Sequence, residues 1–221
     1  VITFGTDKKS DIFPTRVIKS KNLTKIFFKL KNQKIDLKIK NINIHNVLAS
    51  LAVMKELNLN IKSVKSFFKR IEPTEGRGKT HFISRYNKKF KLIDESYNAN
   101  PLSVKNAINN LSLIKKEKFK KYLILGDMLE LGHKSEKYHK DLSKVINNSD
   151  IDKVFIKGEK TLFTYKNLHK SKQGNILQNK DDIDLILGKI INNNDYLMIK
   201  GSNATGLNIL SKRIIRGLNA I

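Results

Sequence analysis

The sequence predicts an α/β fold, with a mostly parallel C-terminal sheet that carries helices on both faces. From residue 81 onward, short β-rich runs alternate with longer stretches of helical periodicity, which is typical of a parallel sheet covered by helices. The run at residues 122–125 is wholly apolar, as in a parallel strand buried on both faces. Before residue 76 the order differs, because strands come first and helices follow.

The N-terminal segment, residues 1–44, reads as strands. Residues 25–30 and 34–39 flank a short polar turn, and apolar residues alternate with polar ones along the second run. This alternation predicts a β-hairpin with one buried face.

Two helices are predicted next, from His45 to about residue 57 and over residues 62–70. Val53 and Met54 widen the apolar face of the first helix, so we expect that helix to be buried. Residues 71–80 then lack apolar periodicity and carry proline and glycine, which indicates a domain boundary. We therefore expect one domain over residues 1–75 and a second over residues 76–221.

The boundary segment contains Gly78-Lys79-Thr80, which looks like the end of a phosphate-binding loop. Such a loop needs a glycine five residues before Gly78, where Pro73 stands, and a helix afterwards, where a strand is predicted. We reject a phosphate-binding loop here.

The remaining elements alternate between strand and helix. Residues 161–179 are polar, and the pattern does not place them. The predicted strands cover residues 81–86, 89–93, 122–125, 153–157 and 196–200, and the predicted helices cover residues 101–115, 134–146, 181–191 and 206–218.

Polar turns follow three of these strands, at residues 95–100, 126–127 and 201–202. The carboxyl ends of parallel strands share one edge of the sheet, and ligands bind there. Asn100 is a suitable N-cap and Pro101 a suitable first residue for the helix that follows. The sequence therefore predicts a site at this edge, with a simple polar turn as the alternative interpretation.

The bulk composition limits the class of protein. The chain has 221 residues, of which 39% are hydrophobic, enough to bury one large core or two small ones. It has no cysteine, which excludes disulfides and thiolate metal sites and fits a reducing, cytoplasmic location. No apolar run is long enough to cross a bilayer, and no signal peptide is visible. The histidines at 81, 133, 139 and 169 are not spaced as metal ligands, and we expect them on the surface or on helix faces.

The net charge of +24 raises the alternative of a basic nucleic-acid-binding protein. The lysines are scattered through every segment, and no nucleic-acid-binding motif is present. We favour a solvated basic surface, with a sequence bias such as an AT-rich genome would produce.

The run DESYNANP at residues 94–101 resembles the signature of the Mur ligase family. Four further motifs of that family occur in the same order, so the resemblance covers nearly the whole chain. These motifs are HN at 45–46, GRG at 76–78, LGDMLELG at 125–132 and KGS at 200–202. The resemblance is greatest to the member that adds D-alanyl-D-alanine to UDP-N-acetylmuramoyl-tripeptide.

The resemblance implies that residues 1–75 end a central ATP-binding domain and that residues 76–221 form a Rossmann-like C-terminal domain. It implies an ATP-dependent amide-bond ligase of peptidoglycan precursor synthesis that works as a monomer with ATP and Mg²⁺ through an acyl phosphate. Its partners would be the two substrates named above, with neither nucleic acid nor a membrane. A sister ligase, such as another Mur ligase or a folylpolyglutamate synthase, is the alternative.

The resemblance also implies that part of the catalytic machinery lies elsewhere. The chain begins with Val1, holds no phosphate-binding loop and no UDP-binding domain, and is expected to be a C-terminal fragment. Most magnesium ligands would then lie outside it, and residues 1–221 alone would be inactive.

The residues that would bind the nucleotide are carried over from the family one by one. Asn46 would hydrogen-bond the adenine, Glu95 would accept from the ribose hydroxyls, and Arg77 would reach the ATP phosphates as a catalytic group. Two departures weaken the match, because relatives often carry asparagine where Ala49 stands and aspartate where Glu95 stands.

A second set would serve the other substrates. Lys200 would be catalytic, and Lys200 and Ser202 would face the incoming dipeptide or the developing phosphate. Tyr97, Asn98 and Asn100 would complete the substrate-binding set. The family often has arginine after the serine, where this chain has asparagine, so the anion-binding strength of this loop is open.

Overall fold

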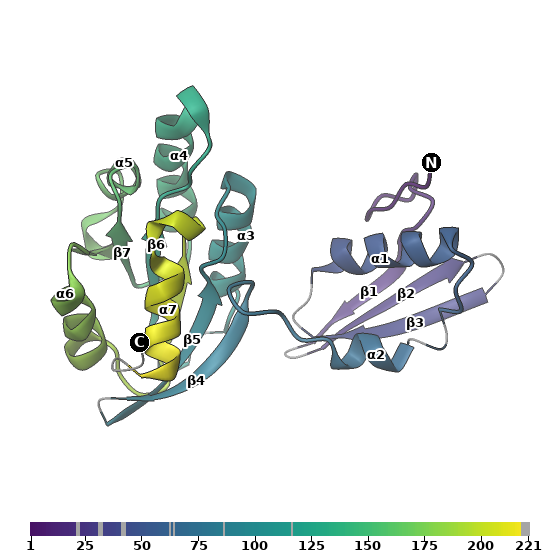
Figure 1. The fold of residues 1–221 in the computed structure, drawn as a ribbon, viewed down its shortest axis with the longest axis horizontal. Coiled ribbons are helices and arrows are strands. Elements are labelled where there is room, and N and C mark those ends of the chain that lie inside the picture. Colours follow the sequence, from purple (N-terminus) through teal and green to yellow (C-terminus); the bar gives the residue numbers. More distant parts are fainter. Residues whose placement is uncertain are drawn as a thin grey trace. The chain divides into compact units, whose positions relative to one another are not determined.

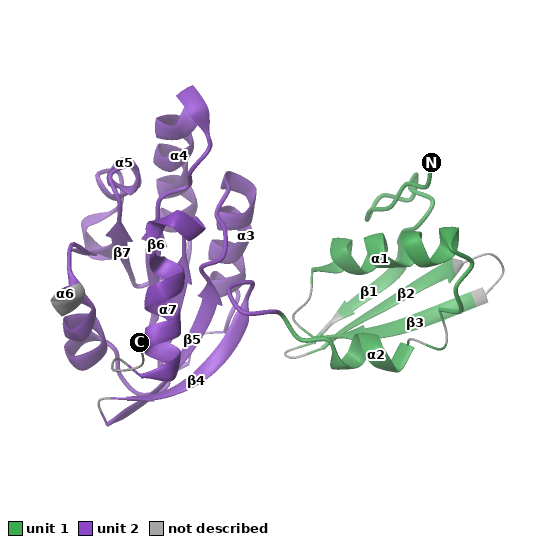
Figure 2. Ribbon diagram, viewed as in Figure 1, with its two compact units in different colours: residues 1–73 green, residues 74–221 purple. Residues whose placement is uncertain are grey.

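The computed structural model describes residues 1–20, 23–30, 33–40, 43–61, 63, 65–85, 87–115 and 117–217. The chain divides into two compact units, Val1–Pro73 and Thr74–Ile221, and each is described by itself (Figure 2). The sequence placed a domain boundary between residues 75 and 76.

Unit 1 is a small antiparallel sheet with two helices (Figure 1). Strand β1 (Pro14–Lys19) pairs with β2 (Thr24–Leu30), which pairs with β3 (Gln33–Ile39). The predicted hairpin is confirmed, with Lys25 opposite Lys38 and Lys29 opposite Lys34.

Helix α1 (Ile44–Glu56) packs its predicted face into the core of unit 1, and α2 (Lys65–Arg70) adds Phe68. The helix begins one residue earlier than expected, because the side chain of Asn43 caps it by accepting from the backbone N–H of His45 at 2.9 Å. The expectation of burial all round is wrong, because Val53 is 59% exposed and only one face meets the small sheet.

Unit 2 is built on a six-stranded sheet in which β4 is antiparallel to β5 and the other pairs are parallel. The predicted parallel sheet is confirmed. In order across the sheet, the strands are β4 (Lys79–Arg85), β5 (Lys88–Glu95), β9 (Tyr196–Lys200), β6 (Lys121–Gly126), β7 (Lys153–Lys157) and β8 (Gln173–Ile176).

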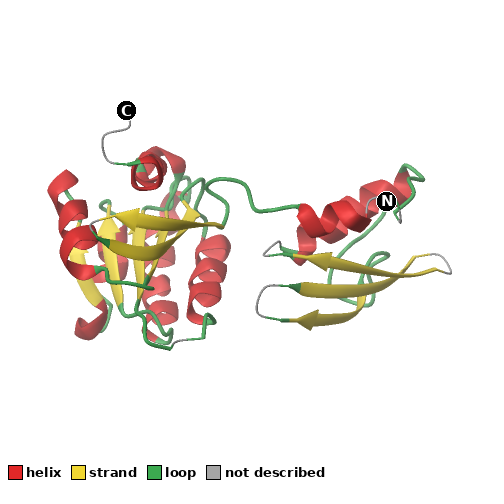
Figure 3. Ribbon diagram, turned by 90° about the horizontal axis from the view of Figure 1, so that it is seen from below, coloured by secondary structure: helices red, strands yellow, loops and turns green. Residues whose placement is uncertain are grey.

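Helices cover both faces of this sheet, as expected (Figure 3). Apolar side chains of α3 (Pro101–Ser112), α4 (Ser135–Asn147) and α5 (Thr161–Tyr165) pack on one face. The other face is covered by α6 (Lys180–Leu185), its π-helical continuation Ile186–Ile190, and α7 (Leu207–Arg216). Every residue of β6 is buried, because this strand lies between the two helical layers.

Three short 3₁₀ helices complete the described part of unit 2, at Gly132–Lys134, Lys170–Lys172 and Asn203–Thr205. Three elements lie in the segment that the sequence pattern did not place, namely α5, the 3₁₀ helix Lys170–Lys172 and β8. Among the residues that the structure describes, no helix combines the length and apolarity needed to cross a membrane.

Candidate functional site

The polar turns meet at one edge of the sheet of unit 2. The last residue of β5, Glu95, is opposite Lys200 of β9, and Lys200 is opposite Leu125 of β6. The carboxyl ends of these strands are therefore neighbours, and the turns that follow them come together. This convergence is what the predicted parallel sheet requires.

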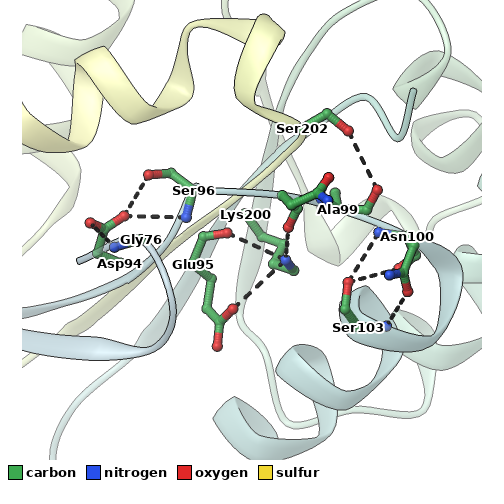
Figure 4. Close-up of polar contacts among 10 residues, drawn as sticks. Gly76, Asp94, Glu95, Ser96, Ala99, Asn100, Ser103, Lys200 and Ser202 are labelled. Atoms are coloured by element: carbon green, nitrogen blue, oxygen red, sulfur yellow. Dashed lines mark hydrogen bonds and ion pairs between the residues drawn. The ribbon is translucent and has the colours of Figure 1, made fainter. Parts of the chain in front are cut away.

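Lys200 lies beneath the turn that follows β5 and is only 2% exposed (Figure 4). Its ammonium group donates to the carbonyl oxygens of Glu95, at 3.3 Å, and of Asn98. The carboxylate oxygen Oε2 of Glu95 lies 3.7 Å from the same nitrogen. Two hydrogen bonds to backbone carbonyl oxygens and one ion pair therefore attach Lys200 to the turn.

The Glu95–Lys200 pair is held in a partly desolvated environment. Burial raises the pKa of Glu95, and the positive charge of Lys200 opposes this shift. Burial likewise lowers the pKa of Lys200, and the charge of Glu95 opposes it. Both shifts have the same cause, which is the cost of keeping an ion away from water. The side chain of Glu95 remains 25% exposed, so its carboxylate can still accept from a ligand.

Ser202 joins two of the converging turns and is 5% exposed. Its hydroxyl accepts from the backbone N–H of Leu129 at 3.0 Å and donates to the carbonyl oxygen of Ala99 at 3.4 Å. Its own backbone N–H donates to the carbonyl oxygen of Asp127 at 3.1 Å. Ser202 therefore holds the turn after β5 against the loop after β6.

The side-chain amides of Asn98 and Asn100 hydrogen-bond to backbone groups close by in the sequence. Asn100 caps α3, because its side chain accepts from the N–H of Ser103 at 2.8 Å while the Ser103 hydroxyl accepts from the N–H of Asn100 at 3.0 Å. The side-chain oxygen of Asn98 accepts from the N–H of Ala99 at 2.7 Å. The predicted cap is confirmed, and both asparagines remain exposed.

Arg77 and Tyr97 are also exposed, and their side chains lie against each other. The guanidinium carbon of Arg77 lies 4.1 Å from the centre of the Tyr97 ring, a cation–π distance. Tyr97 is 49% exposed. The positive charge of Arg77 also lowers the pKa of both Glu95 and Lys200, as a smaller contribution beside burial. Of the predicted site residues, seven therefore come together in unit 2.

The eighth, Asn46, belongs to unit 1. It lies in the first turn of α1 with an exposed side chain, and its carbonyl oxygen accepts from the hydroxyl of Ser50 at 2.9 Å. The helix is capped by Asn43, so the side chain of Asn46 is not needed as a cap.

Sequence reasoning missed two buried residues beside the site. Asp94, 3% exposed, accepts from the N–H of Gly76 at 2.9 Å and from the hydroxyl of Ser96 at 2.6 Å (Figure 4). His139 is fully buried on the inner face of α4, and its Nε2 accepts from the N–H of Met128 at 3.0 Å. Asp94 opens the DESYNANP motif at residues 94–101, but the pattern gave no sign that its side chain would be buried against Gly76. His139 lay on a helix face, as expected, but nothing in its local pattern indicated the contact with Met128.

Within the described ranges, no three histidine, aspartate or glutamate side chains gather closely enough to hold a metal ion. Asp127, which follows β6, instead accepts from the backbone N–H groups of Lys160 and Thr161 at 3.2 and 2.8 Å, at the start of α5.

Comparison with known proteins identifies similar sequences. Residues 78–203 match the family model described as "Mur ligase, glutamate ligase domain". The UDP-N-acetylmuramoyl-tripeptide–D-alanyl-D-alanine ligase of Buchnera aphidicola subsp. Baizongia pistaciae is 28% identical over 221 residues, which cover 98% of this chain and 46% of that protein. The ligase of the same name from Bacillus subtilis is 33% identical over 128 residues, or 56% of this chain and 28% of that protein. The chain thus spans less than half the length of these relatives.

Solved structures share the fold. The UDP-N-acetylmuramoylalanyl-D-glutamyl-2,6-diaminopimelate–D-alanyl-D-alanyl ligase of Acinetobacter baumannii has a TM-score of 0.79 at 18% identity, over 98% of this chain and 46% of that one. The MurF ligase of Thermotoga maritima in complex with ADP has a TM-score of 0.76 at 20% identity, over 97% and 49%. The folylpolyglutamate synthase/dihydrofolate synthase of Yersinia pestis is less similar, with a TM-score of 0.60 at 12% identity over 85% and 43%.

Proposed function

The chain belongs to the Mur ligase family, and we propose that it forms the C-terminal part of an ATP-dependent ligase of peptidoglycan precursor synthesis. This ligase joins D-alanyl-D-alanine to UDP-N-acetylmuramoyl-tripeptide. The observation that carries the proposal is the similarity over 98% of the chain to a relative of that name. The folded site supports it, because seven of the eight predicted site residues lie together in unit 2.

The proposed reaction forms an amide in two steps. The terminal carboxylate of the tripeptide attacks the γ-phosphorus of ATP, which gives an acyl phosphate and ADP. The amine of D-alanyl-D-alanine then attacks the acyl carbon, the carbon–oxygen bond to phosphate breaks, and inorganic phosphate leaves with the loss of a proton from nitrogen. Magnesium, when bound, neutralises charge on the phosphates during the transfer.

The residues of this chain fit the binding tasks in that scheme. Arg77 is exposed and carries a guanidinium fork suited to phosphate oxygens. Glu95 presents a partly exposed carboxylate that can accept from two ribose hydroxyls. The exposed amide of Asn46 can donate to and accept from the edge of an adenine.

On the substrate side, the geometry assigns different tasks to neighbouring residues. Tyr97, Asn98 and Asn100 are exposed and can contact the dipeptide. Lys200 and Ser202 are buried beneath them and have acceptors or donors already. In this proposal Lys200 and Ser202 act by holding the turn in shape.

Residues 1–221 alone are proposed to be inactive, because the chain spans less than half of its relatives and its sequence holds no phosphate-binding loop. The complete protein is proposed to be a cytoplasmic monomer. Molar mass from light scattering would show a dimer if this is wrong.

The function is tested on the complete protein encoded by the gene that contains this sequence. We expect phosphate release from ATP only when both UDP-N-acetylmuramoyl-tripeptide and D-alanyl-D-alanine are present. The mass of the product should exceed that of UDP-N-acetylmuramoyl-tripeptide by the mass of the dipeptide minus one water. Release with a folate and glutamate instead would establish the sister activity of the Yersinia protein. Release with single amino acids in place of the dipeptide would indicate another Mur ligase.

The basic net charge favours one alternative from another class of protein, a nucleic-acid-binding protein, which can be tested directly. A nucleic-acid-binding protein would bind mixed-sequence DNA or RNA with an affinity that falls steeply as salt increases. We expect no such binding at about 150 mM salt, the physiological range, measured by fluorescence anisotropy of a labelled oligonucleotide.

A further inference from the structure

We propose that Asp94 is the positioning residue for Arg77, acting by anchoring the loop at residues 74–78 to the end of β5. The inference rests on the proposed function, in which Arg77 contacts the phosphates of ATP. Asp94 itself touches no substrate in this proposal. It differs from its neighbour Glu95, whose carboxylate is partly exposed.

The carboxylate of Asp94 is buried and fully engaged. One oxygen, Oδ2, accepts from the backbone N–H of Gly76 at 2.9 Å, directly beside Arg77. The other, Oδ1, accepts from the hydroxyl of Ser96 at 2.6 Å and from its backbone N–H at 3.2 Å (Figure 4). The side chain thus bridges the loop that carries Arg77 and the turn that carries Tyr97.

Backbone contacts extend the same bridge. The N–H of Gly78 donates to the carbonyl oxygen of Asp94 at 2.7 Å, and the N–H of Tyr97 donates to that of Gly76 at 3.1 Å. Arg77 is therefore held on both sides through its neighbours.

The approach of the loop is close at Gly76, which has a φ of +73°. A Cβ added there would lie 2.8 Å from the Cβ of Tyr97. The loop consequently packs directly on the residue over which the Arg77 guanidinium lies.

This arrangement gives Asp94 a specific task. Arg77 is exposed and long, so its position depends on where its backbone is fixed. An Asp94→Asn change keeps the size of the side chain but leaves one carbonyl oxygen to serve donors on both Gly76 and Ser96. Because one set of donors must then lose its partner, the loop loosens and Arg77 reaches the phosphates less often.

The experiment is a double-mutant cycle in the complete enzyme, with Asp94→Asn, Arg77→Ala and the double variant. We expect Asp94→Asn to lower kcat/KM for ATP by about tenfold, the scale of a small misplacement of a positioned group. In the Arg77→Ala background the same change should have no further effect, because the group that it positions is absent. An equal loss in both backgrounds would overturn the proposal.

Asp195 provides the matched control. It is 2% exposed, and its two carboxylate oxygens accept from the backbone N–H groups of Lys120 and Asn192, both at 2.7 Å. It precedes β9, at the opposite end of the strands from the site. Asp195→Asn should lower the melting temperature as Asp94→Asn does but leave kcat/KM for ATP unchanged. If Asp195→Asn lowered kcat/KM as much as Asp94→Asn does, general destabilisation would explain both losses, and the proposal would be overturned.

Two further measurements keep the test decisive. If Asp94→Asn does not fold, Ser96→Ala removes the hydroxyl that orients the carboxylate, and its smaller kinetic loss should also vanish in the Arg77→Ala background. If the wild-type enzyme shows no ligase turnover, the proposed function fails. The anchoring of the 74–78 loop by Asp94 can still be tested by NMR in the 221-residue chain. There, Asp94→Asn should shift the Arg77 Nε–H resonance and speed exchange of the Gly76 amide, and Asp195→Asn should do neither. Unchanged Gly76 exchange in Asp94→Asn would overturn the anchoring itself.

Discussion

At the scale of single residues, the site depends on ions held partly away from water. Lys200 donates hydrogen bonds to two backbone carbonyl oxygens, forms an ion pair with the Glu95 carboxylate, and is 2% exposed. Removing one member of such a pair leaves the other buried without its partner, which is costly. The pair therefore sets the shape of the turn between Glu95 and Asn98.

The first prediction concerns pH and Glu95. Burial raises the pKa of Glu95 above its ordinary value of 4.5, so the folded chain holds this proton to higher pH than the unfolded chain does. The folded form binds more protons between 4.5 and the raised pKa, and its stability must fall as pH rises through that window. The free energy of unfolding of the wild-type chain should thus fall, relative to that of Glu95→Gln, as pH rises above 4.5. Above the raised pKa, the difference between the two free energies should stay constant.

The measurement is urea unfolding of both 221-residue chains at intervals from about pH 4 upward, expressed as a free-energy difference. Glu159→Gln, on an exposed turn, controls for the loss of one negative charge. A difference between wild type and Glu95→Gln that grows in favour of the wild type with rising pH would contradict the assignment.

At the scale of elements, helix α4 and two loops are joined by a chain of hydrogen bonds. His139 donates from Nδ1 to the carbonyl oxygen of Ser135 at 2.8 Å and accepts at Nε2 from Met128. The next N–H, of Leu129, donates to Ser202. Because Nε2 accepts a backbone donor, the imidazole is held as the neutral Nδ1–H tautomer.

The second prediction follows from this contact. His139→Leu leaves the N–H of Met128 buried without its acceptor, which should cost about 1–3 kcal/mol of stability. Exchange of the Met128 amide, measured by NMR, should accelerate more than that of amides in β6. His139→Gln, whose terminal oxygen can reach the position of Nε2, should restore part of the protection.

Ser143 is the control for this experiment. It is buried on the same helix, and its hydroxyl donates to the carbonyl oxygen of Lys140 at 2.7 Å, away from the loop. Ser143→Ala should destabilise the chain slightly. Exchange of the Met128 amide should then accelerate only as much as the loss of global stability accounts for. If His139→Leu behaved in the same way, the histidine would not hold the loop.

At the scale of the whole molecule, each unit has a core of its own. The described core of unit 1 is a single cluster between its sheet and helices, whereas unit 2 has one cluster on each face of its sheet. A domain that buries its own apolar surface can fold alone.

The third prediction is that residues 74–221 fold without unit 1. The isolated segment should show a cooperative thermal transition by circular dichroism and a dispersed amide NMR spectrum. A second isolated segment, residues 1–73, has only its single small core and should melt at a lower temperature, because small domains bury a smaller fraction of their surface. A non-cooperative transition in the 74–221 segment would show that its two clusters do not suffice.

The sequence by itself determined the elements whose pattern is local. Alternation revealed the β2–β3 hairpin, apolar runs revealed β6, β7 and β9, and helical spacing with Asn100 and Pro101 revealed α3. It also predicted that the polar turns meet at one edge of the sheet, because the edge at which parallel strands end follows from their order. Short elements escaped, since α5 has five residues and β8 four, too few for a period to show.

Only the tertiary structure decided what the buried polar groups do. Lys200 meets Asn98 across 102 positions of sequence, Ser202 meets Ala99 across 103, and His139 meets Met128 from another element. A local pattern reports which face of a helix or strand is apolar, but it carries no information about which distant donor will lie opposite a given acceptor. Those partners are fixed by strand order and register, and so the contacts of Asp94, Lys200 and His139 emerged only once the chain was folded.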